Sequence, residues 1–268
     1  STAKVLGLED VMPKCSVGVH SGEYGLFMEK VKGLEASDFS KGKAMPDGGL
    51  SINDVKKLPP EQQAKVIGDI MRGINRLEWL DLITGQGDRH SHNYMIYVGK
   101  DLTVSVKGID NDACFPAYRK GLRKYVLKGQ NAKEFMNSCN YIIANYPKGR
   151  QAEVRNRLFR DPGVQQDDHG NIVIDTFKFQ AGELHFAARR AVGMHGAVLP
   201  DYIDAELYAQ LISLKSGEKR EAYLADLANR LPKKAVDSTR RRLDEAIAYA
   251  EQLFKDGKVI NKEDFRKQ

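Results

Sequence analysis

The chain has 268 residues, which is enough for one large domain or two small ones. Its formal net charge is +6, from 42 Lys and Arg against 36 Asp and Glu, which gives only a mild preference for anionic partners. Cys15, Cys114 and Cys139 are too few and too scattered for a disulfide framework or a cysteine zinc site, so we expect a reducing compartment. No run of about 18 apolar residues and no signal-peptide pattern is present, so we expect a cytoplasmic protein. Peripheral attachment to a membrane and secretion into a host cell stay open.

The N-terminal part predicts a β-hairpin followed by an irregular connection. Residues 15–20 and 24–29 are rich in strand-forming side chains and flank the Ser-Gly pair at 21–22. From residue 32 to residue 60 the sequence is rich in Gly, Ser, Asp, Pro and Lys with little periodicity. We therefore expect a loop there with one short helix from Ile52 to Leu58.

A long helix and a second hairpin are predicted next. After the two prolines at 59–60, apolar residues recur at three- and four-residue steps from Ile67 to Leu80, and the Gly-Gln-Gly run at 85–87 ends this pattern. The apolar runs 94–98 and 103–109 are separated by a Gly-Lys-Asp turn, which indicates another pair of strands.

Beyond Pro116 we expect a mainly helical remainder. The predicted helices are 186–192, 205–214, 221–231 and 237–254. Between residues 165 and 179, an Asp-His-Gly-Asn turn predicts two short strands. Arg240 to Arg242 have Asp244 and Glu245 as neighbours, so a salt-bridged surface is favoured over a nucleic-acid site, and we expect no nucleic-acid partner.

Three polar residues of the second hairpin have the chemistry of phosphoryl transfer. Asp88 and Asn93 lie five residues apart before the first strand, and Asp110 follows the second strand. Phosphoryl transfer needs a carboxylate that orients or deprotonates the attacking hydroxyl, and oxygen ligands that hold magnesium. The D-x-x-x-x-N spacing equals that of the protein-kinase catalytic loop, and Asp110 stands where a kinase has its metal-binding Asp. The alternative is a polar hairpin that only satisfies its own backbone.

These residues resemble a known family. Gly87-Asp88-Arg89-His90 with Asn93, followed by Ile109-Asp110-Asn111, resembles the phosphatidylinositol 3- and 4-kinase superfamily, and the ending through Phe115-Pro116 is similar to the type II phosphatidylinositol 4-kinases and their bacterial relatives. The resemblance implies an ATP- and Mg²⁺-dependent kinase. It implies roles for four residues: catalysis by Asp88, support of the loop by His90, and metal binding by Asn93 and Asp110.

The resemblance extends upstream and implies a fold. Residues 26–33 resemble the last strand of a kinase N-lobe and its hinge, which implies that the adenine is held around Met28, Glu29 and Val31, with Met95 packing beneath it. The implied fold is a kinase-like α+β fold. Residues 1–33 would be a remnant N-lobe β-hairpin and hinge, and residues 34–268 a mainly helical C-lobe with the catalytic hairpin.

Two departures from the family keep an alternative open. The residues before Cys15 are too few for both the Gly-rich loop and the phosphate-holding lysine of a complete kinase, and Asp112 stands where many members have Gly. A non-catalytic kinase-like binding module (a pseudokinase) is therefore the alternative. His90 and His92 lack an identifiable third ligand, so we do not expect zinc.

A basic run at 118–128 lies where a kinase has its activation segment. The resemblance implies a phosphoinositide or a protein as substrate. Arg119, Lys120, Arg123 and Lys124 would receive such an anionic substrate or an anionic membrane surface. A solvated basic face is the alternative reading of the same run.

Overall fold

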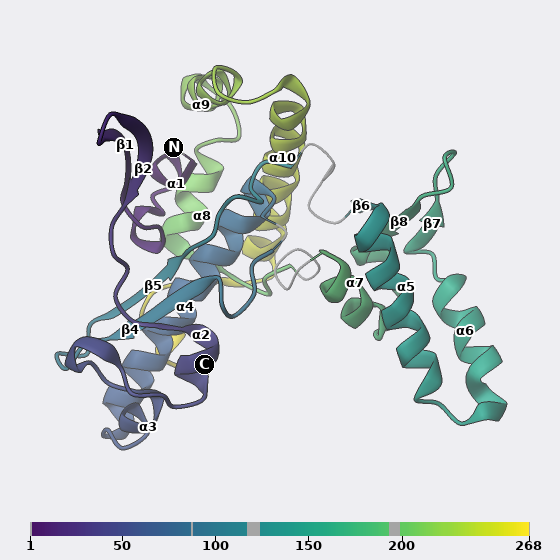
Figure 1. Cartoon of the computed structure of the whole chain (residues 1–268), viewed down its shortest axis with the longest axis horizontal. Helices are drawn as coiled ribbons and strands as arrows, with labels where there is room; N and C mark the ends of the chain where they lie inside the picture. The colour runs from purple at the N-terminus through teal and green to yellow at the C-terminus, as the bar shows by residue number, and fades with distance from the viewer. Residues whose placement is uncertain (1, 87, 117–123, 193–198, 268) are drawn as a thin grey trace.

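The computed structural model describes residues 2–86, 88–116, 124–192 and 199–267. Helices and small, mostly antiparallel sheets give the chain an α+β architecture (Figure 1). The helices are α1 (Thr2–Val5), α2 (Ala36–Ser40), α3 (Ile52–Val55), α4 (Pro60–Thr84), α5 (Gly129–Ala144), α6 (Gln151–Phe159), α7 (Leu184–Val192), α8 (Ala205–Ile212), α9 (Glu218–Ala228) and α10 (Lys233–Lys255). The strands are β1 (Cys15–His20), β2 (Glu23–Met28), β3 (Leu34–Glu35), β4 (Tyr94–Val98), β5 (Val104–Gly108), β6 (Lys124–Leu127), β7 (Val164–Gln166), β8 (Ile172–Asp175), β9 (Ile203–Asp204) and β10 (Val259–Ile260).

The first hairpin is confirmed and is strongly exposed. β1 and β2 pair in antiparallel register from Cys15 opposite Met28 to His20 opposite Glu23. Large apolar side chains of this hairpin face solvent, with Tyr24 86% and Val17 76% exposed. Two strands alone bury little apolar surface, so this hairpin draws little stability from its own packing.

The long helix α4 is confirmed, and its ends follow the expected signals. Pro60 opens it at a position where the missing N–H costs no hydrogen bond. Gly85 ends it in the left-handed conformation at φ +77°, donating to the carbonyl of Asp81 at 2.8 Å. The expected short helix at 52–58 is wrong at its C-terminal end, because α3 stops at Val55. Leu58 precedes Pro59, and helical geometry is disfavoured for the residue before a proline.

Helix α4 packs on the second hairpin, which is also confirmed. β4 and β5 pair from Tyr94 opposite Gly108 to Val98 opposite Val104, and β3 adds to the free side of β4. A Cβ atom on Gly73 would lie 2.7 Å from a methyl group of Val106, so only glycine allows the helix to approach β5 this closely. Buried residues of α4, β4, β5, α8, α9 and α10 form the first hydrophobic core.

The middle of the chain forms a second hydrophobic core. Phe135, Leu158, Ile174 and Leu184 are buried there, among α5, α6, α7 and a sheet ordered β6-β8-β7. In Figure 1 these elements stand apart as their own group, at the right of the view. The expected strands around the 168–171 turn are confirmed as β7 and β8. The sequence did not predict β6, whose partner β8 lies far along the chain.

The prediction of a salt-bridged surface at Arg240 to Arg242 is wrong for Arg242. Its side chain is fully buried and donates to the carbonyls of Ile83 at 3.0 Å and Thr84 at 3.2 Å. The last carbonyls of a helix have no partner within the helix, and a cation at this end also suits the helix dipole. Arg242 of α10 therefore caps α4 immediately before the Asp88 loop.

None of the described helices has the length and hydrophobicity needed to cross a bilayer. The division of the chain at residue 33 stays a prediction.

Candidate functional site

The loop after α4 is built around one buried arginine. Arg89 forms a bidentate ion pair with Asp81 of α4, with Nε to Oδ2 at 2.9 Å and Nη2 to Oδ1 at 3.0 Å. Its Nη1 donates to the carbonyls of Asn93 and Ile109, and Nη2 also reaches the side-chain oxygen of Asn111. One guanidinium thus joins the helix, the loop and the turn that follows β5.

Asp88 is exposed at the tip of this loop while its backbone is fixed. Its N–H donates to the side-chain oxygen of Gln86 at 2.9 Å, and its carbonyl accepts from the amide of Asn93 at 2.8 Å. The Gln86 amide donates in turn to the carbonyl of Asp110 at 2.9 Å. The backbone of Asp88 is therefore held by two hydrogen bonds while its carboxylate faces solvent, where it could accept a proton. Gly87 lies outside the described residues.

Asp110 lies beside other carboxylates at the end of β5. Its backbone is left-handed, with φ +55°, which is uncommon for a residue other than glycine. The negative charge of Asp112 is the main cause that raises the pKa of Asp110, and burial, a hydrogen bond to Asp112 and the charge of Asp88 add to it. Asp88 and Asp110 thus lie near one another, joined through the side chain of Gln86, and Asp112 is a third carboxylate beside Asp110.

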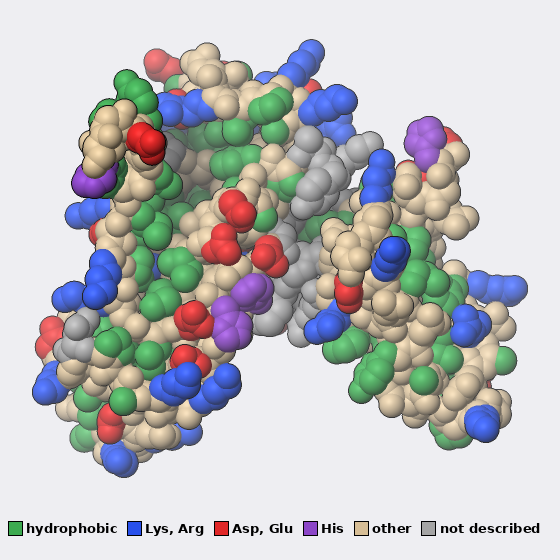
Figure 2. Space-filling model, viewed as in Figure 1, with side chains coloured by type: hydrophobic (Ala, Val, Ile, Leu, Met, Phe, Trp, Pro, Cys, Tyr) green, Lys and Arg blue, Asp and Glu red, His purple; other side chains and the backbone are tan. Residues whose placement is uncertain are grey.

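Figure 2 shows acidic and histidine side chains gathered on one face of the elements around the first hydrophobic core. This face is turned toward the elements around the second hydrophobic core. Carboxylates that lie close together repel one another, and a bound cation would reduce this repulsion.

Asn93 and Asp110 fit the chemistry of a magnesium site. Asn93 is buried, and because its amide nitrogen is engaged by the Asp88 carbonyl, its side-chain oxygen is the atom left for a cation. Amide and carboxylate oxygens are hard ligands that suit Mg²⁺. Within residues 2–86, 88–116, 124–192 and 199–267, no group of three His, Cys, Asp or Glu side chains is arranged to share a metal ion.

The two histidines of the loop contact each other and the segment after the first hairpin. The ring nitrogen Nδ1 of His90 accepts from the backbone N–H of His92 at 3.2 Å. His92 Nδ1 lies 2.5 Å from a carboxylate oxygen of Glu35 and 3.1 Å from the hydroxyl of Ser37. Both contacts use the same ring nitrogen, so the group is not arranged as a Ser-His-acid relay, which needs one ring nitrogen for each partner.

The expected adenine-binding residues are brought partly together. Glu29 forms an ion pair with Lys107 of β5, and Lys107 stands directly opposite Met95 of β4. Cross-strand partners project to the same face of a sheet, so Glu29 and Met95 lie near one another. Met28 ends β2 and is 52% exposed, and Val31 is half-buried after the strand.

Sequence reasoning missed the residues that hold the site together. The apolar pattern of α4 places Asp81 on the buried face, one turn after Leu77. A carboxylate on such a face requires a buried partner. This signal could have identified Arg89 as structural. Of the basic run, Arg119, Lys120 and Arg123 lie outside the described residues, as does the side chain of Lys124 in β6.

Comparison of the chain with protein-family models, with curated proteins and with solved structures found no match.

Proposed function

We propose that this chain carries the catalytic part of an ATP- and magnesium-dependent phosphotransferase. The observation that carries the proposal is the convergence of the Asp88 loop and the Asp110 turn at one end of the β4–β5 hairpin, where the Gln86 side chain accepts from the N–H of Asp88 and donates to the carbonyl of Asp110. The Gln86 and Arg89 hydrogen bonds hold both segments in place. A solvent-facing carboxylate beside a cation-attracting cluster is the arrangement that phosphoryl transfer requires.

Each residue has a distinct role in this proposal. Asp88 accepts or orients the proton of the attacking hydroxyl, and His90 supports the loop. Asn93 and Asp110 hold Mg²⁺, which neutralises charge on the phosphate oxygens of ATP. Two protein ligands leave most of an octahedral shell to phosphates and water, so metal and nucleotide bind together.

The proposal also gives the nucleotide base a location, beside the segment that follows β2. We place the adenine between the segment from Met28 to Val31 and Met95 on β4, where Glu29 and Lys107 already form an ion pair. The backbone around Glu29 supplies hydrogen bonds to the adenine edge, while the thioether of Met95 supplies an apolar surface.

The acceptor in this proposal is a hydroxyl of a phosphoinositide or of a protein side chain. The basic run that contains Arg119, Lys120, Arg123 and Lys124 would attract either anionic substrate, or the membrane surface that carries it. We propose a cytoplasmic location with peripheral attachment to anionic membranes.

A non-catalytic nucleotide-binding module is the second candidate, favoured by one observation. Asp112 places a second negative charge directly beside Asp110, which makes Asp110 harder to deprotonate. A metal ligand that retains its proton binds cations less well.

The test is a transfer assay with the whole chain. The protein is incubated with ATP labelled at the γ-phosphate, with Mg²⁺, and with either phosphoinositide vesicles or a mixture of proteins. We expect label on a lipid or on protein hydroxyls, and none when EDTA is added. Saturable ATP binding without transfer to either acceptor would support the binding module, and absence of ATP binding would contradict both candidates.

A further inference from the structure

A cavity of about 650 Å³ lies among the elements around the second hydrophobic core. Its lining comes from the start of helix α5, from the end of α6, and from the sheet ordered β6-β8-β7. None of the residues that we assign to nucleotide, metal or acceptor lines it. The volume falls within the range of roughly 300–1,000 Å³ that is typical of small-molecule sites.

The wall of this cavity is apolar and open to contact. Beneath it, Leu127 and Phe135 are 1% and 0% exposed and belong to the core. Above them the wall is formed by apolar side chains that are only half-buried, namely Ala132, Met136, Phe159, Val164 and Ile172. Because protein covers these side chains only in part, a ligand can bury their remaining apolar surface, which favours binding.

The polar side chains of the lining stand at or next to one edge of the sheet. β6 ends at Leu127, directly opposite Ile172 at the start of β8, and Gln166 at the end of β7 lies opposite the same Ile172. Lys128 and Asn171 are the next residues beyond this edge and also line the cavity. The cavity thus has a polar mouth at the strand ends and an apolar interior along α5 and α6. This arrangement suits a ligand with one polar end and a long apolar part.

The mouth of the cavity favours an anionic end group. The side chain of Lys128 is exposed and makes no ion pair or hydrogen bond in the part of the chain that the structure describes. Gly129, which also lines the cavity, begins the 16-residue helix α5, whose positive dipole end adds to this charge. The two aspartates of the 167–170 turn do not line the cavity, and Asp167 already accepts from the N–H of Asn171 at 2.8 Å.

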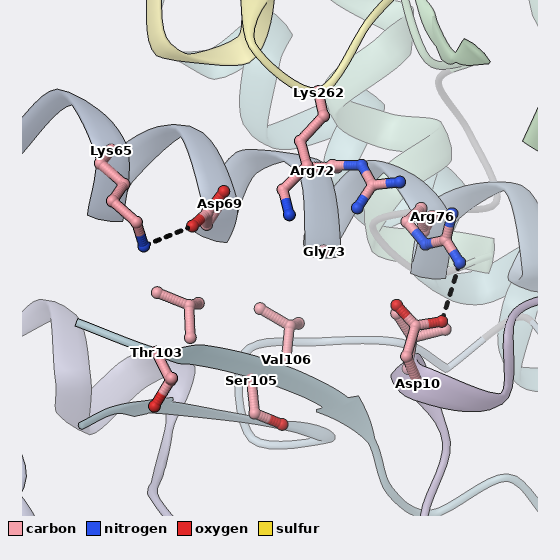
Figure 3. A pocket seen from close by; sticks show the side chains of 12 residues that line it. Asp10, Lys65, Asp69, Arg72, Gly73, Arg76, Thr103, Ser105, Val106 and Lys262 are labelled. Atoms are coloured by element: carbon pink, nitrogen blue, oxygen red, sulfur yellow. Dashed lines mark hydrogen bonds and ion pairs between the residues drawn. The ribbon is translucent and has the colours of Figure 1, made fainter. Parts of the chain in front are cut away.

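Another cavity, between α4 and β5, offers a different chemistry (Figure 3). Its charged side chains are paired with one another, with Lys65 at 3.1 Å from Asp69 and Arg76 at 2.9 Å from Asp10. These groups therefore have little bonding capacity left for a ligand.

We propose that the cavity beside α5 binds a fatty acid, with the alkyl chain against Met136, Phe159 and Val164 and the carboxylate at the mouth beside Lys128. Burial of the chain supplies the affinity, and the charge at the mouth sets the orientation. The site is separate from the proposed nucleotide site, and its occupation does not depend on phosphoryl transfer.

Titration calorimetry on the whole chain with hexanoate, octanoate and decanoate tests the burial of the alkyl chain. Each buried CH₂ group should raise the affinity about threefold to fourfold, so decanoate should bind about tenfold more tightly than octanoate. Equal affinities across the series would overturn the burial of the chain. No saturation by millimolar decanoate would overturn the site itself.

Octanol tests the end group, because it has the same chain length as octanoate and no charge. We expect octanol to bind about threefold more weakly than octanoate, since one exposed cation and a helix dipole contribute modestly. Octanol that binds as tightly as octanoate would overturn the placement of the carboxylate at Lys128.

NMR of isotope-labelled methionine methyl groups places the ligand without any substitution. The Met136 signal should shift as decanoate is added, because Met136 lines the cavity. The signal of Met71, which lies on α4 and does not line the cavity, should stay unchanged. A Met136 signal that does not respond at saturating decanoate would refute the location.

Two variants and a matched control test the same location. Ala132→Phe fills the cavity from α5 and should abolish decanoate binding. Met136→Gln keeps the length of the side chain but makes the wall more polar, and should weaken binding at least threefold. Ala152→Phe makes the same change as the first variant at an exposed position of α6 outside the cavity, and should leave affinity unchanged. Unaltered binding in both cavity variants, each with a wild-type melting temperature, would overturn the proposal.

Discussion

Arg89 and Asp81 form a bidentate ion pair from which solvent is excluded, with side-chain exposures of 0% and 1%. The pair lies between the last turn of α4 and the Asp88 loop, and the other donors of Arg89 reach the carbonyls of Asn93 and Ile109. Helix, loop and hairpin thus depend on one guanidinium. The exposed carboxylates of the site can repel one another without unfolding the loop because this buried pair holds their backbone.

We expect Arg89→Ala to destabilise the protein strongly. Removing one partner of a buried ion pair leaves the other charge without compensation, which costs about 3–5 kcal/mol. Urea unfolding followed by circular dichroism measures the loss. The double variant Asp81→Leu with Arg89→Met leaves no unpaired charge and should lose less. Arg155→Ala, at an exposed position of α6, should change the free energy of unfolding by no more than about 0.5 kcal/mol.

Asp88→Asn should separate catalysis from folding. The substitution keeps the size of the exposed side chain but removes the charge that accepts or orients the proton, so we expect a loss in kcat of ~100-fold or more. The melting temperature should stay unchanged, because the loop is held through the Asp88 backbone rather than its carboxylate. Asp168→Asn in the exposed turn before β8 is the matched control. Full activity of Asp88→Asn would refute the assignment.

Magnesium should bind only together with nucleotide. Asn93 and Asp110 offer two protein ligands, whereas Mg²⁺ takes about six in octahedral geometry. Calorimetry without ATP should detect weak binding or none, and addition of ATP should produce binding that Asp110→Asn removes. Tight magnesium binding to the nucleotide-free chain would contradict this ligand set.

Asp112→Asn should lower the pKa of Asp110, because the charge of Asp112 is the largest cause that raises it. A raised pKa in the folded state means that the folded protein holds this proton more tightly than the unfolded chain. The stability that Asp110 contributes is therefore present at acid pH and is lost as the pH rises through its folded pKa. Carboxyl NMR titration measures the shift directly. Since both side chains face solvent, added salt should reduce the difference between wild type and variant, and an unchanged titration curve would contradict the pairing.

For Glu183 we expect the opposite dependence of folding stability on pH. Hydrogen bonds from Arg157 and Tyr146 lower the pKa of its carboxyl to about 2, with the arginine as the main cause. A lowered pKa gives stability that is present above the ordinary pKa of a glutamate and is lost as the pH falls toward about 2. The melting temperature of the wild type should therefore drop over this interval, and that of Glu183→Gln should drop less. Parallel curves would show that the carboxylate contributes nothing.

Sequence reasoning succeeded where structure follows from neighbouring residues. The periodicity of α4, the glycine at its end and the turn of the second hairpin are local signals, and together they place Asp88 near Asp110. Sequence reasoning failed where the residue that a segment or side chain contacts lies far along the chain. β6 is defined by pairing with β8, and the burial of Arg242 is defined by carbonyls at the end of α4, and neither can be read from a short stretch of sequence.

The separation of the buried apolar residues into two clusters affects how the unfolding of this chain should be measured. Phe135, Leu158 and Ile174 belong to one cluster, and Leu77 and Leu243 belong to the other. Each cluster has its own sheet and helices, so a calorimeter should record two endotherms rather than a single cooperative transition. Arg89 variants should move one endotherm and Glu183 variants the other, which gives each perturbation an internal reference within the same molecule.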